Sequence, residues 1–196
     1  MSEDGRVQQK ARTRAELIRA ARALMDDGSA PTVEEAAAAA SVSRATAYRY
    51  FPTRRALLAA AYPELTAGSL LGEDAPRDAE TRLDLVLEGI TRQMLEHEPV
   101  LRTMLRLSLE ARTATPDDLP FRAGRRIVWV ADALEPLRAE LTEPARERLV
   151  LAIAAAVGID ALVWLTDVAG LSRAAAVDLM CSSARTLLQA ARAACS

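Results

Sequence analysis

The sequence predicts an all-α protein with two domains. Apolar residues recur at the spacing of helices along most of its 196 residues, and no convincing strand pattern interrupts them. Residues 66–77, which contain two glycines and a proline, predict a connector between two helical parts. Because 51% of all residues are hydrophobic, residues 1–65 and residues 78–196 can each bury a core.

The first predicted helix runs from Thr13 to Asp27. Leu17, Ala21 and Leu24 would share one face, and Gly28 is placed to end the helix. Residues 1–12 lack apolar periodicity, so we expect a mobile basic arm there. Such an arm would either contact phosphates or serve only as a solubilising tail.

The next stretch, residues 32–58, predicts two short helices, a tight turn between them and a third helix. Thr32 and Glu35 have the spacing of a capping box, and Ser43 is placed to cap the second helix. Pro52 ends that helix, and Thr53 caps the following one. This layout is a helix-turn-helix, which in other proteins lays one helix in the major groove of DNA.

At these residues the chain resembles the tetracycline-repressor (TetR) family of bacterial transcriptional regulators. It departs from the family's pattern in having Ala36, Ser41, Ala47, Arg54 and Arg55 where the family has Ile, Gly, Leu, Lys and Glu. At Ser41 a β-carbon disfavours the positive φ of the usual turn. The positions that match the pattern are Thr32, Ala37, Ala40, Val42, Ser43, Thr46, Tyr48, Phe51 and Leu57.

The charge distribution supports a nucleic-acid partner for the N-terminal domain. The formal net charge is −2, but residues 1–60 carry ten basic and seven acidic side chains. The remaining residues carry fifteen basic and twenty acidic side chains. A basic end on an acidic body is typical of a DNA-binding head attached to an effector domain.

Groove chemistry suggests a role for each candidate DNA contact. Arg44 can donate two hydrogen bonds to guanine, and Thr46 can touch a base or a phosphate. The Ala47 methyl would meet a thymine methyl, whereas Tyr48 and Tyr50 would bind phosphates. The resemblance implies a phosphate contact for Arg54, and Thr32 would bring a helix N-terminus towards a phosphate. Each could instead be an ordinary exposed side chain, while Phe51 is expected in the core. The predicted set is Thr32, Ser43, Arg44, Thr46, Ala47, Tyr48, Tyr50 and Arg54.

The second domain is predicted to be a helical bundle. One helix carries the apolar stripe from Leu83 to Leu95, and the next spans residues 100–109. After a loop at 113–120, a helix would run from Phe121 to Leu141 with a kink at Pro136. A long helix would follow from Thr142 to Val168, and a last helix from Ser172 to Ala194.

Residues 149–165 are apolar nearly all round, so we expect them to be buried on more than one side. A membrane span is disfavoured because Asp160 interrupts a run that is shorter than about 20 residues. Small residues would instead let another helix approach closely, and the resemblance implies a four-helix dimer interface. The alternative is the central core helix of a monomer. The predicted interface residues are Ala154, Ala155, Gly158, Ala161, Ala175, Leu179, Ala184 and Leu188.

The resemblance also implies that a small molecule enters the bundle and changes the separation of the heads. The residues that could line such a ligand site suit an apolar or aromatic ligand, although plain core packing would explain each of them as well. Asp160 could pair with an arginine, cap an interface bond or meet a cationic ligand group, and His97 could cap a helix end. The candidate pocket residues are Met94, Met104, Leu105, Leu107, Phe121, Trp129, Asp160 and Trp164.

Signatures of enzymes are missing from the sequence. With one histidine, and with Cys181 and Cys195 outside any C-x-x-C pair, the chain predicts no metal site. It also has no phosphate-binding loop and no nucleophile elbow, so we expect no catalytic residues and no cofactor. No signal peptide is evident, which favours the cytoplasm. The resemblance implies a bacterial protein that joins the nucleoid when it is bound to DNA.

Together these features predict a homodimeric repressor that a small apolar or aromatic ligand releases from a palindromic operator. Its two-fold symmetry would match half-sites about 34–36 Å apart, or a multiple of that repeat. One alternative is a regulator of the same fold that activates, or that responds to a protein partner. Another is an all-helical small-molecule-binding protein or enzyme without specific DNA binding.

Overall fold

The computed structural model describes residues 3–66, 68–110 and 124–194, which form helices and no strand. This confirms the predicted all-α class. By its internal contacts the chain divides into two compact units. The first, called the head here, consists of the described residues of Met1–Thr66 and Pro99–Ala123; the second, called the body, consists of those of Ala67–Glu98 and Gly124–Ser196. Residues 99–110 therefore group with the head, although the sequence suggested the second domain for them.

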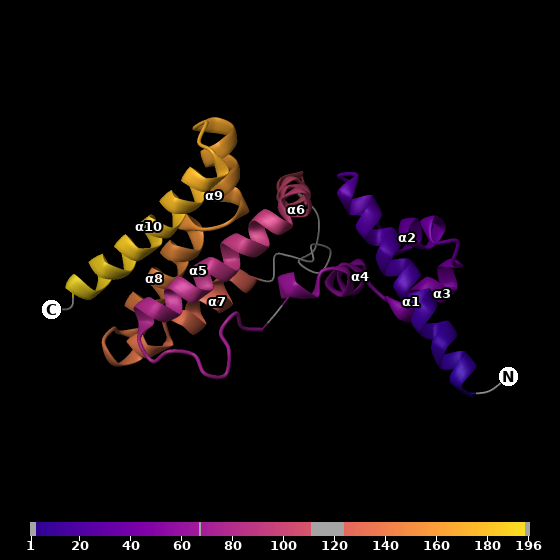
Figure 1. The fold of residues 1–196 in the computed structure, drawn as a ribbon, viewed down its shortest axis with the longest axis horizontal. Coiled ribbons are helices and arrows are strands. Elements are labelled where there is room, and N and C mark those ends of the chain that lie inside the picture. The colour runs from indigo at the N-terminus through magenta and orange to yellow at the C-terminus, as the bar shows by residue number, and fades with distance from the viewer. Residues whose placement is uncertain (1–2, 67, 111–123, 195–196) are drawn as a thin grey trace. The chain divides into compact units, whose positions relative to one another are not determined.

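The first helix, α1 (Glu3–Asp26), is longer than expected (Figure 1). The segment predicted as a mobile arm is helical from Glu3 onward. Its Gln, Lys, Arg and Ala residues favour a helix by propensity, and the missing apolar periodicity determines only that the segment is not buried. As predicted, α1 buries Leu17 and Ala21 and is followed by Gly28, which has a φ of +80°.

Helix α2 (Val33–Ala39) begins with the predicted capping box. The Thr32 hydroxyl accepts a hydrogen bond from the Glu35 amide at 3.1 Å, and the Glu35 carboxylate accepts one from the Thr32 amide at 2.7 Å. At the other end Ser41 adopts the left-handed conformation, with φ +54°, despite its β-carbon. The Val42 amide donates to the carbonyl of Ala37 at 2.9 Å, which closes a Schellman turn and offsets the strain.

Helices α3 (Arg44–Tyr50) and α4 (Arg54–Ala61) are also capped as the sequence predicts. The Ser43 hydroxyl accepts from the amide of Thr46, and the Thr53 hydroxyl accepts from the amide of Ala56. A 3-10 turn, Pro63–Thr66, follows α4, because Pro63 cannot continue the α-helical ladder.

The core of the head is built largely from alanine. Phe51 is its only aromatic ring among the described buried residues, and it is 3% exposed. Since alanine side chains are small, the helices of the head pack closely around this ring. The buried residues of this core are Leu17, Ala21, Val33, Ala36, Ala37, Ala47, Phe51 and Leu57.

A second cluster in the head includes the helix α6 (Glu98–Glu110). Val100 and Met104 of α6 pack with Met25 of α1 and with Leu58 and Ala61 of α4. This packing is the physical reason that α6 from Pro99 groups with the head.

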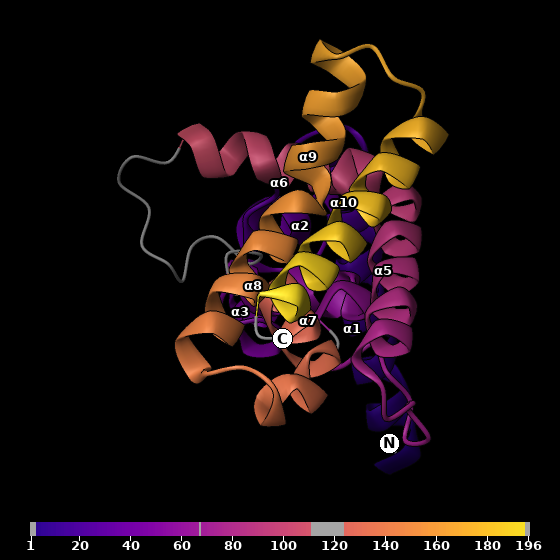
Figure 2. The same ribbon diagram turned by 90° about the vertical axis from the view of Figure 1, so that its left-hand side faces the viewer.

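The body is built from α5 (Ala79–Glu96), α7 (Arg125–Ala133), α8 (Glu143–Ala156) and α10 (Arg173–Ala193), which lie side by side (Figure 2). Helix α5 buries Leu83, Leu87, Ile90 and Met94 as predicted, whereas Leu95 is 41% exposed. Helix α7 ends before Pro136 rather than kinking there, and a 3-10 turn, Glu135–Ala139, follows.

The expected long helix from Thr142 to Val168 is broken. Helix α8 ends at Ala156, and a separate α9 (Ile159–Val163) continues into a π-helical turn, Trp164–Val168. Gly158 lies at the break with φ +153° and ψ −179°, a conformation open essentially to glycine alone. Apolar periodicity cannot reveal such a break, because it is the same on both sides of it.

No single described helix is both long and apolar enough to cross a membrane. Only α8 together with the segment Ile159–Val168 meets the length and composition of a span, and that pair is bent by 41°.

Candidate nucleic-acid interface

Helix α3 carries the polar candidates at its start. The Arg44 side chain is 74% exposed, and Thr46 and Tyr48 are partly exposed. The buried face of α3 is supplied by Ala47, which turns the remaining positions outward. The head thus presents a short helix with a guanidinium, a hydroxyl and a phenol near its N-terminus, groups that can bind base edges and phosphates.

Glu34, in the first turn of α2, contacts two of these side chains. Its Oε1 accepts a hydrogen bond from the Tyr48 hydroxyl at 2.6 Å and lies 2.9 Å from Nη2 of Arg44. The Arg44 guanidinium also lies 5.7 Å from the centre of the Tyr48 ring. The bond from Tyr48 holds the pKa of Glu34 below its usual range, with smaller help from a backbone amide and from Arg44, and the same bond raises the pKa of Tyr48.

Thr32 and Ser43 are exposed residues at helix starts. The Ser43 hydroxyl, besides capping α3, donates to Oγ1 of Thr46 at 2.8 Å. The Thr32 hydroxyl donates to Glu35 at 2.9 Å within the capping box. Both residues therefore fix the ends of the two helices and remain open to solvent.

Three other candidates are placed less favourably for DNA. Ala47 is completely buried in the head core, so its methyl is not available to a thymine; this corrects the role expected for it. Tyr50 is half-buried against the same core. Arg54 is also half-buried, and its guanidinium donates to the carbonyl oxygen of Ala30.

These helices coincide with a known family pattern. Residues 17–61 match the model of a family described as bacterial regulatory proteins, tetR family. These residues therefore form a DNA-binding head of the tetR type. The chain is a DNA-binding transcriptional regulator, as that head domain implies. No curated protein matches the chain.

The described candidate ligand residues are divided between the head and the body. Met94 and Trp129 are buried in the body, but Met104 is packed in the head and Leu105 is half-buried on α6. Trp164 is 59% exposed. Phe121 and the side chain of Leu107 lie outside the described residues.

Asp160 makes the arginine pairing that was one of its expected roles. Its Oδ1 lies 2.7 Å from Nη1 of Arg126, and its side chain is 45% exposed. His97 is the C-cap residue of α5, as its position suggested.

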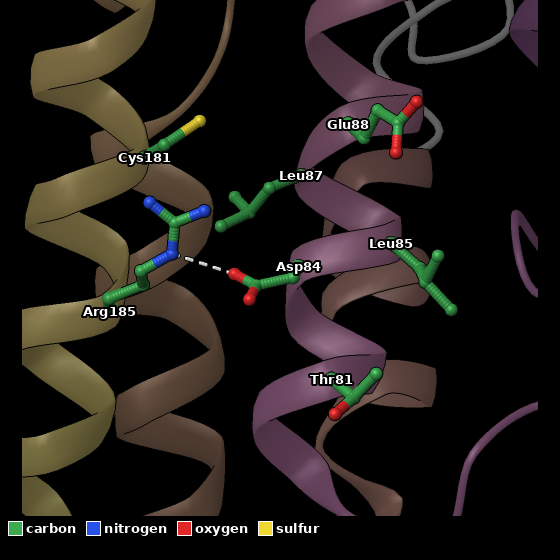
Figure 3. Close-up of a pocket in the computed structure, with 7 residues that line it drawn as sticks. All are labelled: Thr81, Asp84, Leu85, Leu87, Glu88, Cys181 and Arg185. Atoms are coloured by element: carbon green, nitrogen blue, oxygen red, sulfur yellow. Dashed lines mark hydrogen bonds and ion pairs between the residues drawn. The ribbon is translucent and has the colours of Figure 1, made fainter.

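A hollow of about 350 Å³ lies between α5 and α10 of the body, and none of the described candidate ligand residues lines it (Figure 3). An ion pair between Arg185 and Asp84, at 2.7 Å, crosses it. Burial raises the pKa of the Cys181 thiol in its wall, so this thiol is protonated near neutral pH.

The candidate interface residues fall into two groups. Ala155, Ala175 and Leu179 are exposed, and Ala161 is half-buried. The other four are buried within the chain itself: the packing of α8 on α10 buries three of them, and Gly158 lies at the start of α9 beside Arg126. These four are Ala154, Gly158, Ala184 and Leu188.

Two residues of the chain were not singled out from the sequence. Glu34 touches Arg44 and Tyr48, but no spacing rule links residues ten and fourteen apart on different helices. Gln93 is 91% buried in α5, and its carboxamide oxygen finds no hydrogen-bond partner among the described residues. A polar residue on the apolar stripe of α5 was the signal that could have identified it.

Proposed function

We propose that the chain is a homodimeric repressor that binds a palindromic operator and that a small apolar or aromatic molecule releases. The observation that carries this proposal is the exposed start of α3, where Arg44, Thr46 and Tyr48 face solvent beside a capped helix end. In the proposed complex Arg44 reads a guanine, Thr46 touches a base or a phosphate, and Tyr48 binds a phosphate. Thr32, Ser43, Tyr50 and Arg54 contribute to phosphate binding.

The dimer is supported by apolar side chains that the folded chain leaves exposed. Leu151 and Leu179 are 53% and 46% exposed, and Trp164 and Val168 are 59% and 70% exposed. Ala155 lies one helical turn after Leu151, as Leu179 does after Ala175. Small and apolar residues at this spacing suit a partner helix, and water-exposed apolar surface favours association.

Leu179→Glu is expected to convert the dimer into a monomer. It would place a charge in the proposed apolar interface, where burial without a partner is costly, while a side chain already 46% exposed leaves the fold of the monomer intact. Molar mass by light scattering is the measurement. Ala174→Glu adds the same charge at an exposed position on another side of α10 and should remain dimeric. A dimeric Leu179→Glu variant would show that the interface lies elsewhere.

Support for a small effector comes from the interior of the body. Met94 and Trp129 are buried there, and the buried carboxamide oxygen of Gln93 is a hydrogen-bond acceptor without a partner among the described residues. An apolar or aromatic molecule with one donor group would satisfy that oxygen. Such a ligand changes DNA binding only if it binds one state of the dimer more tightly than the other.

Selection of bound duplexes from a random pool, at a stated salt concentration, tests the proposal. The expected result is an enriched palindrome whose half-sites are about 34–36 Å apart, or a multiple of that distance. The selected operator then serves to screen small molecules for release. Salt-sensitive binding without any enriched sequence would contradict a sequence-specific repressor.

Arg44→Ala is expected to weaken operator binding by about 1–3 kcal/mol and to relax the preference at one base position. The reason is the loss of a bidentate hydrogen bond to a guanine edge. Repeating the selection with the variant measures the change base by base. Arg19→Ala, which removes an exposed charge of α1, is the matched control and should leave the consensus unchanged. Equal weakening by Arg44→Ala on all duplexes would assign Arg44 to a phosphate instead.

A further inference from the structure

The carboxylate of Glu34 contacts Arg44 and Tyr48, the two side chains of α3 that are proposed to make the principal contacts with DNA. One oxygen, Oε1, accepts from the Tyr48 hydroxyl at 2.6 Å and pairs with Nη2 of Arg44 at 2.9 Å. The acidic residue comes from α2 and the two donors come from α3, so the contact joins both helices of the helix-turn-helix. The guanidinium of Arg44 and the hydroxyl of Tyr48 also interact with each other, so the three side chains form one cluster.

We propose that Glu34 is an affinity-setting residue that competes with DNA for Arg44 and Tyr48. In the free protein its carboxylate occupies these donors, and on binding the donors pass from the carboxylate to the nucleic acid. The inference rests on the proposed function, because it uses the assignment of Arg44 and Tyr48 as DNA contacts.

The hydrogen-bond capacity of Tyr48 makes the exchange necessary. A phenol has one O–H proton, and in the free head Glu34 accepts it. A phosphate oxygen is also only an acceptor, so Tyr48 cannot donate to a phosphate while it donates to Glu34. The raised pKa of Tyr48 and the lowered pKa of Glu34 agree with a neutral phenol bound to a charged carboxylate.

Arg44 is restrained more loosely. A guanidinium has five N–H donors, and the ion pair with the carboxylate is made through Nη2, so it does not use all of them. Its side chain is 74% exposed and that of Glu34 is 36% exposed, which makes this an ion pair that water and salt weaken. Transferring Arg44 from Glu34 to DNA therefore costs little free energy. The carboxylate nevertheless places a negative charge where a phosphate backbone approaches, and this charge opposes every DNA complex of the head.

Glu34→Gln tests the proposal, because it removes the charge and keeps the shape of the side chain. Dissociation constants are measured by fluorescence anisotropy on a mixed-sequence duplex and on the selected operator, at one salt concentration. We expect the variant to bind both duplexes about three- to ten-fold more tightly than the wild type. Glu34→Ala, which also removes the acceptor, should bind at least as tightly, and unfolding curves establish that both variants are folded.

Glu16→Gln is the matched control. It removes the same charge from the head, but Glu16 pairs with Arg12 on its own helix, α1, at 3.0 Å. The local effect of Glu34 is the gain in DNA affinity of Glu34→Gln that exceeds the gain of Glu16→Gln.

The same change is then made in the Tyr48→Phe and Arg44→Ala backgrounds. If Glu34 acts through these two donors, the gain falls in each background and reaches the Glu16→Gln level when both are replaced. A gain that persists undiminished overturns the proposal, since it would be a general charge effect. Weaker binding by Glu34→Gln also overturns it, because Glu34 would then hold the donors in their DNA-bound positions.

Failure of this inference can be told apart from failure of the proposed function. If Tyr48→Phe and Arg44→Ala each weaken DNA binding but Glu34→Gln matches Glu16→Gln, only the competition is wrong. If Tyr48→Phe and Arg44→Ala bind all duplexes as the wild type does, both proposals are wrong.

Discussion

Gly158→Ala is expected to destabilise the body by about 2–4 kcal/mol and to lower its melting temperature by about 10 °C. Two causes act together. The φ of +153° is rarely adopted by residues with a side chain, and a Cβ at this position would overlap the guanidinium of Arg126. Moving Arg126 away would also disturb its ion pair with Asp160. Both tryptophans of the chain, Trp129 and Trp164, belong to the body, so tryptophan fluorescence follows its unfolding.

Two controls separate these causes. Gly170 has a φ of +73° and open space around its would-be Cβ, so Gly170→Ala should cost only the conformational strain, about 1 kcal/mol. Gly158→Ala in an Arg126→Ala background should recover the steric part of the loss. If Gly158→Ala melts like Gly170→Ala, the guanidinium moves aside freely, and the break between α8 and α9 does not depend on glycine.

Phe51→Ala is expected to destabilise the head by about 3–5 kcal/mol and to abolish DNA binding at physiological temperature. Phe51 is 3% exposed, and its neighbours are mainly alanines that are too short to fill the cavity left by the ring. All three tyrosines lie in the head, so tyrosine absorbance should change at a lower temperature while the tryptophan signal of the body is retained.

Phe51→Leu is the corresponding control, because it keeps most of the apolar volume and should cost clearly less than Phe51→Ala. Urea unfolding, followed by tyrosine absorbance and by tryptophan fluorescence, gives the free energies of unfolding of the two variants on one scale. An unfolding midpoint for Phe51→Ala equal to that of the wild type would mean that the head core collapses around the missing ring.

Helix boundaries in the head could be predicted because their signals are local. Thr32, Ser43 and Thr53 cap the helices that follow them, and each hydroxyl meets an amide only three residues away. In the body Ser172 caps α10 in the same way. A capping interaction depends on a few neighbouring residues, so a single sequence contains all that is needed to predict it.

Features that depend on distant residues could not be predicted. At Gly158 the space for a side chain is taken by Arg126, which is more than thirty residues away in the chain. Ala154 and Leu188 have the small and apolar character of interface residues, but the packing of α8 on α10 buries them within one chain. The contact of Glu34 with Arg44 likewise follows from how α2 crosses α3, and composition and spacing do not determine that crossing.

The alanine-rich core of the head has a consequence for how its DNA preference can change. Ala36, Ala37 and Ala47 are at most 2% exposed, so a larger residue at any of them must displace the side chains around it. Exposed positions such as Arg44 and Ala45 have no such restriction. New operator preferences can therefore be engineered, or can arise by drift, through the outer surface of α3 while its inner surface stays constant.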